Sequence, residues 1–158
     1  MILFLDFDGV LHPDRSPVDK LFCRLGLLQE WLRRRPGVDV VISSSWREAH
    51  PLDELRSFFD DDMQSRIVGV TPNLKVGDWA QVDGEFPPTR FGRQLEVLQW
   101  LRTSSEPWRP WAALDDQAWM FRPLEPRLVV CDPAIGLASE NLAAVDRILG
   151  ICGSQNGH

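Results

Sequence analysis

Residues 2–10 read ILFLDFDGV, an apolar run that ends in two aspartates and a glycine. A continuous apolar run such as Ile2–Leu5 is typical of a parallel strand that is buried on both faces. Asp6 and Asp8 follow it directly, and because they lie two residues apart, a locally extended chain points both side chains the same way. This stretch therefore predicts a buried strand whose carboxyl end carries two carboxylates.

Outward from this stretch, short apolar runs alternate with amphipathic segments, which is the pattern of a parallel sheet covered by helices. Further strands are expected at Val38–Ile42, Ile67–Val70, Trp111–Leu114 and Leu128–Cys131. Helices are expected over residues 17–35, 51–59, 93–102 and 139–149, the last with Ser139 as its N-cap. Residues 72–88 are rich in proline and glycine and are expected to form an ordered loop or a small hairpin.

The first of these helices accounts for the densest run of positive charge in the sequence. Its start is predicted from Ser16 as the N-cap and Pro17 at the first helical position, and Pro36-Gly37 is expected to end it. Arg33–Arg35 then lie in the last turn, where positive charge complements the helix dipole. We favour this structural explanation of the three arginines over a nucleic-acid-binding patch.

Length and composition set the class of protein. The 158 residues correspond to one domain, expected to span residues 1–150 with a flexible tail over residues 151–158. A composition of 44 % hydrophobic and 25 % charged residues excludes a disordered chain, a collagen-like repeat and a coiled coil. The net charge of −6 predicts that the molecule as a whole repels nucleic acid and anionic membranes.

Cysteine usage and hydropathy indicate the compartment. Cys23, Cys131 and Cys152 lack the spacing of a zinc site, and we expect them to be reduced thiols. The apolar run at the N-terminus is too short for a signal peptide, and no stretch approaches the roughly 20 apolar residues of a membrane span. We therefore expect a cytoplasmic protein.

Polar residues stand at the ends of three expected strands: Asp6 and Asp8, then Ser43–Ser45, then Asp115-Asp116. Open α/β sheets bind ligands at the carboxyl ends of their strands, beside the point where strand order reverses. Two like charges about 4 Å apart repel by roughly 4 kcal/mol at an effective dielectric of 20, so converging carboxylates need a cation, a proton or an arginine. Because the candidate ligands are all hard oxygens, without His or Cys, Mg²⁺ is the expected metal.

In order along the chain, these motifs resemble those of the haloacid dehalogenase-like (HAD) superfamily of phosphohydrolases. Residues 6–10, DFDGV, resemble its first motif, DxDG[VT] after a hydrophobic strand, and residues 113–116, ALDD, resemble the fourth. Residues 40–43, VVIS, resemble the second, and Arg93 stands at the place of the third motif's Lys or Arg, with Arg90 as an alternative. The resemblance covers residues 1–149. It implies a Rossmann-like three-layer α/β sandwich with a mostly parallel sheet of about five strands, the first and fourth adjacent.

The resemblance also implies a role for each motif residue. Asp6 is the expected nucleophile, which forms an aspartyl-phosphate, and Asp8 the expected general acid and then base, with its backbone carbonyl on Mg²⁺. Ser43, or alternatively Ser44, is expected to donate a hydrogen bond to the phosphoryl group, and Arg93 to neutralise its oxygens and hold Asp6. Asp115 is expected to bind Mg²⁺, and Asp116 to bind it through water or orient a neighbour. The expected metal set is Asp6, Asp8, Asp115 and Asp116.

Three residues near these motifs have two interpretations each. Trp46 and Arg47 follow the serine run and could contact substrate; alternatively, Trp46 packs under the loop and Arg47 pairs with an acid close to Glu48. His12 could line the mouth of the pocket, although we favour a capped turn residue before Pro13.

The spacing of the motifs leaves the expected site open. Neither residues 11–37 nor residues 46–89 have room for a full cap domain beside the elements they must supply. By resemblance, capless members act on large substrates such as phosphoproteins or nucleic-acid ends, or obtain a lid by oligomerising. The sequence is also similar to small HAD domains of bacterial proteins, some of them linked to RNA repair.

We therefore expect a Mg²⁺-dependent phosphatase that hydrolyses a phosphomonoester of a small molecule or a peptide, as a monomer or homodimer without a membrane partner. The alternative enzyme is a polynucleotide-end (3′ or 5′) phosphatase, which would grip a phosphorylated end with Arg47 and Arg90 and stack it on Trp46 or Trp79. The negative net charge favours the small-molecule or peptide phosphatase over the polynucleotide-end phosphatase, because binding a long polyanion requires many phosphate contacts. An idle HAD fold serving as a binding module is a third hypothesis, which the presence of Asp6, Asp8 and Asp115 disfavours.

Overall fold

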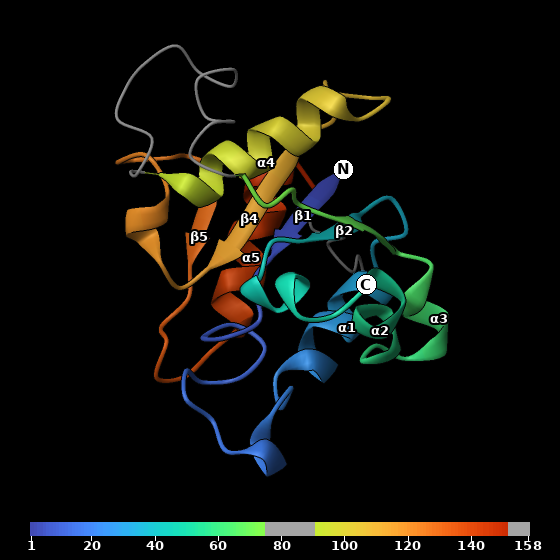
Figure 1. Cartoon of the computed structure of the whole chain (residues 1–158), viewed down its shortest axis with the longest axis vertical. Coiled ribbons are helices and arrows are strands. Elements are labelled where there is room, and N and C mark those ends of the chain that lie inside the picture. Colours follow the sequence, from blue (N-terminus) through green and yellow to red (C-terminus); the bar gives the residue numbers. More distant parts are fainter. Residues whose placement is uncertain (75–90, 152–158) are drawn as a thin grey trace, which may run out of the picture.

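A five-stranded, fully parallel sheet forms the centre of the computed structural model, which describes residues 1–74 and 91–151 (Figure 1). Its strands are β1 (Ile2–Leu5), β2 (Asp39–Ile42), β3 (Ile67–Val70), β4 (Trp111–Asp115) and β5 (Leu128–Val130). Their order across the sheet is β3-β2-β1-β4-β5, so β1 pairs with β2 on one side and β4 on the other. The expected five strands and the adjacency of the first and fourth are confirmed.

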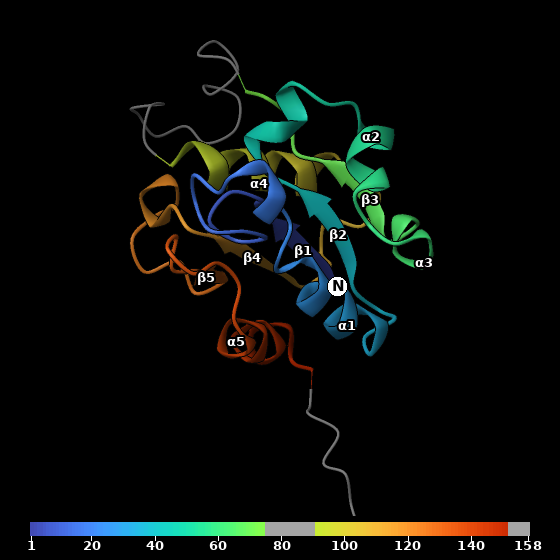
Figure 2. The ribbon, with the colours of Figure 1, turned by 90° about the horizontal axis from the view of Figure 1, so that it is seen from below.

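Helices cover both faces of this sheet. The α-helices are α1 (Leu25–Arg33), α2 (Leu52–Ser57), α3 (Asp61–Gln64), α4 (Gly92–Thr103) and α5 (Ser139–Leu149). In the ribbon, α4 covers one face of the sheet and α1 and α5 cover the other (Figure 2). Ile2 and Phe4 of β1 belong to the core cluster on the α4 side, and Leu3 and Leu5 belong to the cluster on the side of α1 and α5. All four side chains are fully buried, as a continuous apolar run predicts for a central parallel strand. The three-layer α/β sandwich is confirmed.

The helix predicted over residues 17–35 is wrong in its first half. Residues Val18–Lys20 form a single 3₁₀ turn, η1, and α1 begins only at Leu25. Between them Phe22 has a φ of 61°, which no α-helix accommodates. In this conformation its ring stacks on Phe58 at 4.9 Å between centroids, and the packing outweighs the helical spacing of the leucines. Ser16 does not cap a helix: its hydroxyl donates to the carbonyl of Pro13.

Two smaller expectations also need correction or support. The N-cap of α5 is Ala138 and not Ser139; the Ala138 N–H donates to Oδ1 of Asn141 at 2.8 Å. Of the arginine run, only Arg33 lies in the last turn of α1, with Arg34 as the C-cap, so the expected placement of all three in that turn is wrong. Each of the three guanidinium groups nevertheless bonds a carboxylate. Arg33 pairs with Asp60 and Asp62, Arg34 with Glu30, and Arg35 with Asp146.

Between β1 and β2, all of whose connecting residues are described, the chain forms only η1 and α1, so no cap domain is inserted there. Of the predictions beyond that point, Trp79, Arg90, Cys152 and most of the loop over residues 72–88 lie outside the described residues. So does the tail from residue 152. Across residues 1–74 and 91–151, none of the helices has the length and apolar character needed to cross a membrane.

Candidate active site

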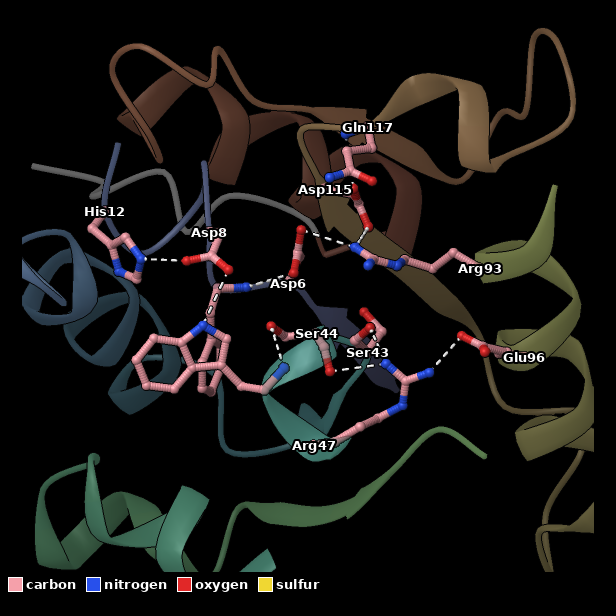
Figure 3. Close-up of polar contacts among 12 residues, drawn as sticks. Asp6, Asp8, His12, Ser43, Ser44, Arg47, Arg93, Glu96, Asp115 and Gln117 are labelled. Atoms are coloured by element: carbon pink, nitrogen blue, oxygen red, sulfur yellow. Dashed lines mark hydrogen bonds and ion pairs between the residues drawn. The ribbon is translucent and has the colours of Figure 1, made fainter. Parts of the chain in front are cut away.

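The parallel order of the sheet brings three polar strand ends to one edge (Figure 3). Asp6 follows β1 directly, Ser43 and Ser44 follow β2, and Asp115 is the last residue of β4. Because β1 lies between β2 and β4, its aspartate sits between the serines and the second aspartate. All four residues are at most 3 % exposed, so the edge is a buried polar site within an apolar sheet.

Arg93 joins the first and fourth strand ends electrostatically. It is the second residue of α4, and its Nη1 lies 2.9 Å from Oδ2 of Asp6 and 2.7 Å from Oδ2 of Asp115. Burial on its own would lower the pKa of the Arg93 guanidinium, but the two carboxylates raise it above its ordinary value. The guanidinium therefore stays charged and orients both aspartates.

Backbone donors hold the other oxygens of the same two aspartates. Oδ1 of Asp6 accepts from the N–H of Phe7, and Oδ1 of Asp115 accepts from the N–H of Gln117, both at 2.8 Å. Each carboxylate thus has one backbone and one arginine contact. Hydrogen bonds of this kind fix the rotamer and leave the remaining lone pairs available for a ligand.

Asp116 completes a group of three carboxylates. Asp6, Asp115 and Asp116 each place one oxygen within 4.8 Å of the others, which confirms the expected closeness of the first and fourth motifs. Burial, and after it the charge of Asp6, raises the pKa of Asp115 to about 7 and that of Asp116 to about 6. Oδ1 of Asp116 is buried and has no hydrogen-bond partner among the described residues.

This group fits the donor set of Mg²⁺. Its ligand atoms are all carboxylate oxygens, which Mg²⁺ prefers, and three carboxylates beside one arginine leave two net negative charges when all are ionised. The unpartnered Oδ1 of Asp116 is an acceptor that a cation would satisfy. The Asp8 carboxylate does not belong to the group.

Gly9 makes the approach of Asp116 possible. Its φ is +72°, a conformation that side chains disfavour, and a Cβ at this position would lie 2.5 Å from Cγ of Asp116. The glycine of the DFDG stretch therefore lets the first and fourth motifs come into contact.

The carboxylate of Asp8 has its own pair of donors. Its Oδ1 lies 2.8 Å from Nε2 of His12, and its Oδ2 accepts from Nε1 of Trp46 at 3.1 Å. The side chain of Asp8 is 43 % exposed, whereas that of His12 is 1 % exposed. Both interpretations of His12 missed this contact. Its position four residues after Asp8 was the one available signal, and nothing in the sequence pointed from Trp46 to Asp8.

Arg47 bonds backbone carbonyls and one carboxylate of the protein itself. It donates to the carbonyls of Ser43, Ser44 and Thr71, and it pairs with Glu96 of α4 at 2.7 Å. Its side chain is 5 % exposed, so the ion-pair alternative describes its contacts, with Glu96 and not a neighbour of Glu48 as the partner. Ser44 accepts a hydrogen bond from the N–H of Trp46 and so caps the 3₁₀ turn η2 (Ser45–Glu48).

The comparisons with known proteins agree with this geometry. Residues 2–142 match the model of a protein family described as the HAD domain in Swiss Army Knife RNA repair proteins. Neither the curated proteins nor the solved structures contain a match to the chain.

Proposed function

The chain belongs to the family of HAD domains found in Swiss Army Knife RNA repair proteins, and from that membership we propose that it is a Mg²⁺-dependent phosphatase that works through an aspartyl-phosphate. The observation that carries the proposal is the placement of Asp6 and Asp115 on the two sides of Arg93, within a group of three carboxylates. Arg93 offsets one of the three negative charges of this group, and a bound cation would offset the remaining charge.

In the first step, a carboxylate oxygen of Asp6 attacks the phosphorus of the substrate. The new O–P bond forms as the ester P–O bond breaks, and the leaving oxygen takes a proton from the carboxyl group of Asp8. The hydrogen bond from the Phe7 N–H and the ion pair with Arg93 orient Asp6 for this attack. Arg93 also offsets negative charge on the phosphoryl oxygens, and Ser43 donates a hydrogen bond to them.

In the second step, the ionised Asp8 removes a proton from water as the water oxygen attacks the same phosphorus. The Asp6–phosphate bond breaks, which releases inorganic phosphate and restores the carboxylate of Asp6 and the carboxyl group of Asp8. The 43 % exposure of Asp8 is consistent with both halves of this role, since substrate and water must each reach it.

The residues that would hold Mg²⁺ are Asp6, Asp115 and Asp116, with the backbone carbonyl of Asp8. When bound, the ion would supply charge neutralisation for the carboxylates and the phosphoryl group. The buried Oδ1 of Asp116 supports its place in this set.

Of the two candidate substrate classes, the family match favours RNA ends that carry a phosphate over small or peptide phosphomonoesters. Arg33–Arg35 are engaged by carboxylates, and Arg47 is buried, so these arginines do not form a track for a long polyanion. This supports a short contact confined to the phosphorylated terminus.

The proposal is tested with the purified chain and an aryl phosphate, in chelator and after addition of Mg²⁺ or Zn²⁺. We expect no turnover in chelator, recovery with Mg²⁺ beyond that with Zn²⁺, and no turnover by Asp6→Asn, because an amide is a poor nucleophile. Asp14→Asn, which removes an aspartate that follows the motif, is the matched control. An Asp6→Asn protein that turns over at the wild-type rate would refute the mechanism.

The substrate class is tested separately. The catalytic efficiency on a 3′- or 5′-phosphorylated RNA oligonucleotide is compared with that on its mononucleotide at two salt concentrations. A preference for the oligonucleotide of about a hundredfold that shrinks with salt indicates an RNA end. Equal efficiencies indicate a small phosphomonoester.

A further inference from the structure

The carboxylate of Asp8 is gripped by two side-chain N–H groups, and neither belongs to the HAD motifs of the sequence. We propose that His12 and Trp46 are positioning residues that aim Asp8 at the leaving oxygen of the substrate. The inference rests on the proposed function, since it assigns a task to two neighbours of the proposed general acid. His12 lies in the loop after β1 and Trp46 in η2 after β2, so the two donors approach Asp8 from different strand ends.

The hydrogen bonds around His12 determine which of its nitrogens carries the proton. Nδ1 accepts from the backbone N–H of Phe22 at 3.3 Å, so in the neutral ring the proton is on Nε2. Nε2 then donates to Oδ1 of Asp8 at 2.8 Å, as Figure 3 shows. The ring is 1 % exposed and therefore cannot turn away from Asp8 into solvent.

Trp46 supplies the second donor, and its indole N–H can only donate. It bonds Oδ2 of Asp8 at 3.1 Å. Each oxygen of a carboxyl group has two lone pairs, so two donors fix its plane and leave one lone pair on each oxygen. A proton can occupy one of these free positions, facing the substrate, while both N–H contacts are kept.

The two donors are themselves held rigidly in an aromatic cluster, defined as Phe7, His12, Phe22, Trp46, His50 and Phe58. Trp46 contacts Phe22 at 5.3 Å, Phe7 and Phe58 at 5.7 Å, and stacks on His50 at 5.4 Å, all between ring centroids. His12 meets Phe22 edge-to-face at 5.4 Å. The left-handed φ of Phe22 serves this cluster, because it directs the N–H at His12 and places the ring against Trp46 and Phe58.

Positioning of a general acid has a specific kinetic signature. A leaving group that is itself a weak acid, such as phenol, needs a proton as the P–O bond breaks, whereas dinitrophenol leaves as a stable anion without one. A variant in which Asp8 is no longer oriented toward the leaving oxygen should therefore hydrolyse phenyl phosphate much more slowly, with a far smaller loss on dinitrophenyl phosphate. Simple loosening of the fold slows both substrates by the same factor.

The experiment measures kcat/KM for a series of phenyl phosphates from dinitrophenyl to unsubstituted phenyl. His12→Phe and Trp46→Phe keep a ring in the aromatic cluster and remove the donor to Asp8. We expect the ratio of dinitrophenyl to phenyl efficiency to rise about 10- to 100-fold in each variant, the scale of outer contacts that orient functional groups. Asp8→Asn provides the upper reference, at about 10²–10⁴-fold.

Phe59→Leu is the matched control, because it removes a buried ring that packs against Phe7 and lies outside the cluster that holds the two donors of Asp8. Its ratio should equal that of the wild type, and circular dichroism establishes that each variant is folded. If His12→Phe does not fold, Trp46→Phe decides the question. A uniform loss across the series overturns the positioning role while leaving the proposed function intact. Absence of Asp6-dependent turnover in the wild type overturns the proposed function and this inference together.

Discussion

Replacing Asp116 by Asn tests whether the acidic group exists to hold a cation. Oδ1 of Asp116 is buried without a partner among the described residues, and one of its oxygens lies within 4.8 Å of oxygens of Asp6 and Asp115. Arg93 contacts Asp6 and Asp115, and no such contact to Asp116 is found in the described part of the chain. In metal-free protein, the charge of Asp116 should therefore oppose folding.

The expected gain in stability follows from the distance between the carboxylate oxygens. Two unit charges 4.8 Å apart repel by about 3 kcal/mol at an effective dielectric of 20. The pKa of Asp116, raised from 3.8 to about 6 by burial and by Asp6, gives a similar figure at roughly 1.4 kcal/mol per pKa unit. Because the side chain is partly exposed, screening reduces this, and we expect Asp116→Asn to raise the free energy of unfolding by about 1–2 kcal/mol.

The stability difference between Asp116→Asn and the wild type depends on pH within a defined window. Since the folded protein holds the Asp116 proton up to a pH of about 6 and the unfolded chain only to about 4, the wild type loses stability as the pH rises between these values. Asn does not titrate, so the advantage of Asp116→Asn is absent below about pH 4 and complete above about pH 7.

The assay is urea unfolding at pH 5 and pH 8, in chelator and in Mg²⁺. Mg²⁺ that binds only the folded state stabilises the wild type by an amount that grows with its concentration, and the variant should gain less. The stability advantage of Asp116→Asn over the wild type in chelator should therefore shrink or reverse in Mg²⁺. A variant less stable than the wild type in chelator at pH 8, or one that Mg²⁺ stabilises as strongly, would contradict the reasoning.

Two further substitutions test the supports of the site. Arg47→Met leaves the buried Glu96 without its cation and should lower the free energy of unfolding by about 3–5 kcal/mol, with part of the loss recovered in the double variant with Glu96→Gln, as measured by urea unfolding. Gly9→Ala forces a Cβ to within 2.5 Å of Asp116 at a φ of +72°, so it should lower stability by about 1–2 kcal/mol or more and weaken Mg²⁺ binding in a calorimetric titration. Gly26→Ala, with nothing within 4 Å of the new Cβ, is the control, and equal behaviour of the two alanine variants would refute the role given to Gly9.

The strands and the parallel sheet were predictable because they follow from the local pattern of apolar and polar residues. The apolar runs placed all five strands to within one residue at each end. Parallel order then follows from the alternation of strands and helices, and it places Asp6, Ser43 and Asp115 at one edge without further information.

Aromatic packing could not be predicted in the same way. The leucines of residues 21–32 have helical spacing, but Phe22 turns into the left-handed region because its ring packs against four others, those of Phe7, His12, Trp46 and Phe58. Spacing along a chain reports on local periodicity, whereas this choice depends on side chains as distant in sequence as Phe58. The helix over residues 17–35 was predicted too long for that reason.

The sequence by itself determined the sheet, its polar edge and the chemical type of the residues there, because strand period and motif order are local properties. Only the tertiary structure decided which partner each of those residues has. Arg47 pairs with Glu96, 49 positions away in the sequence, and Asp8 accepts a hydrogen bond from Trp46, 38 positions away. Such pairs form where the folded chain excludes water, because a buried charge or donor without a partner costs free energy, and that cost arises only once the helices have packed on the sheet.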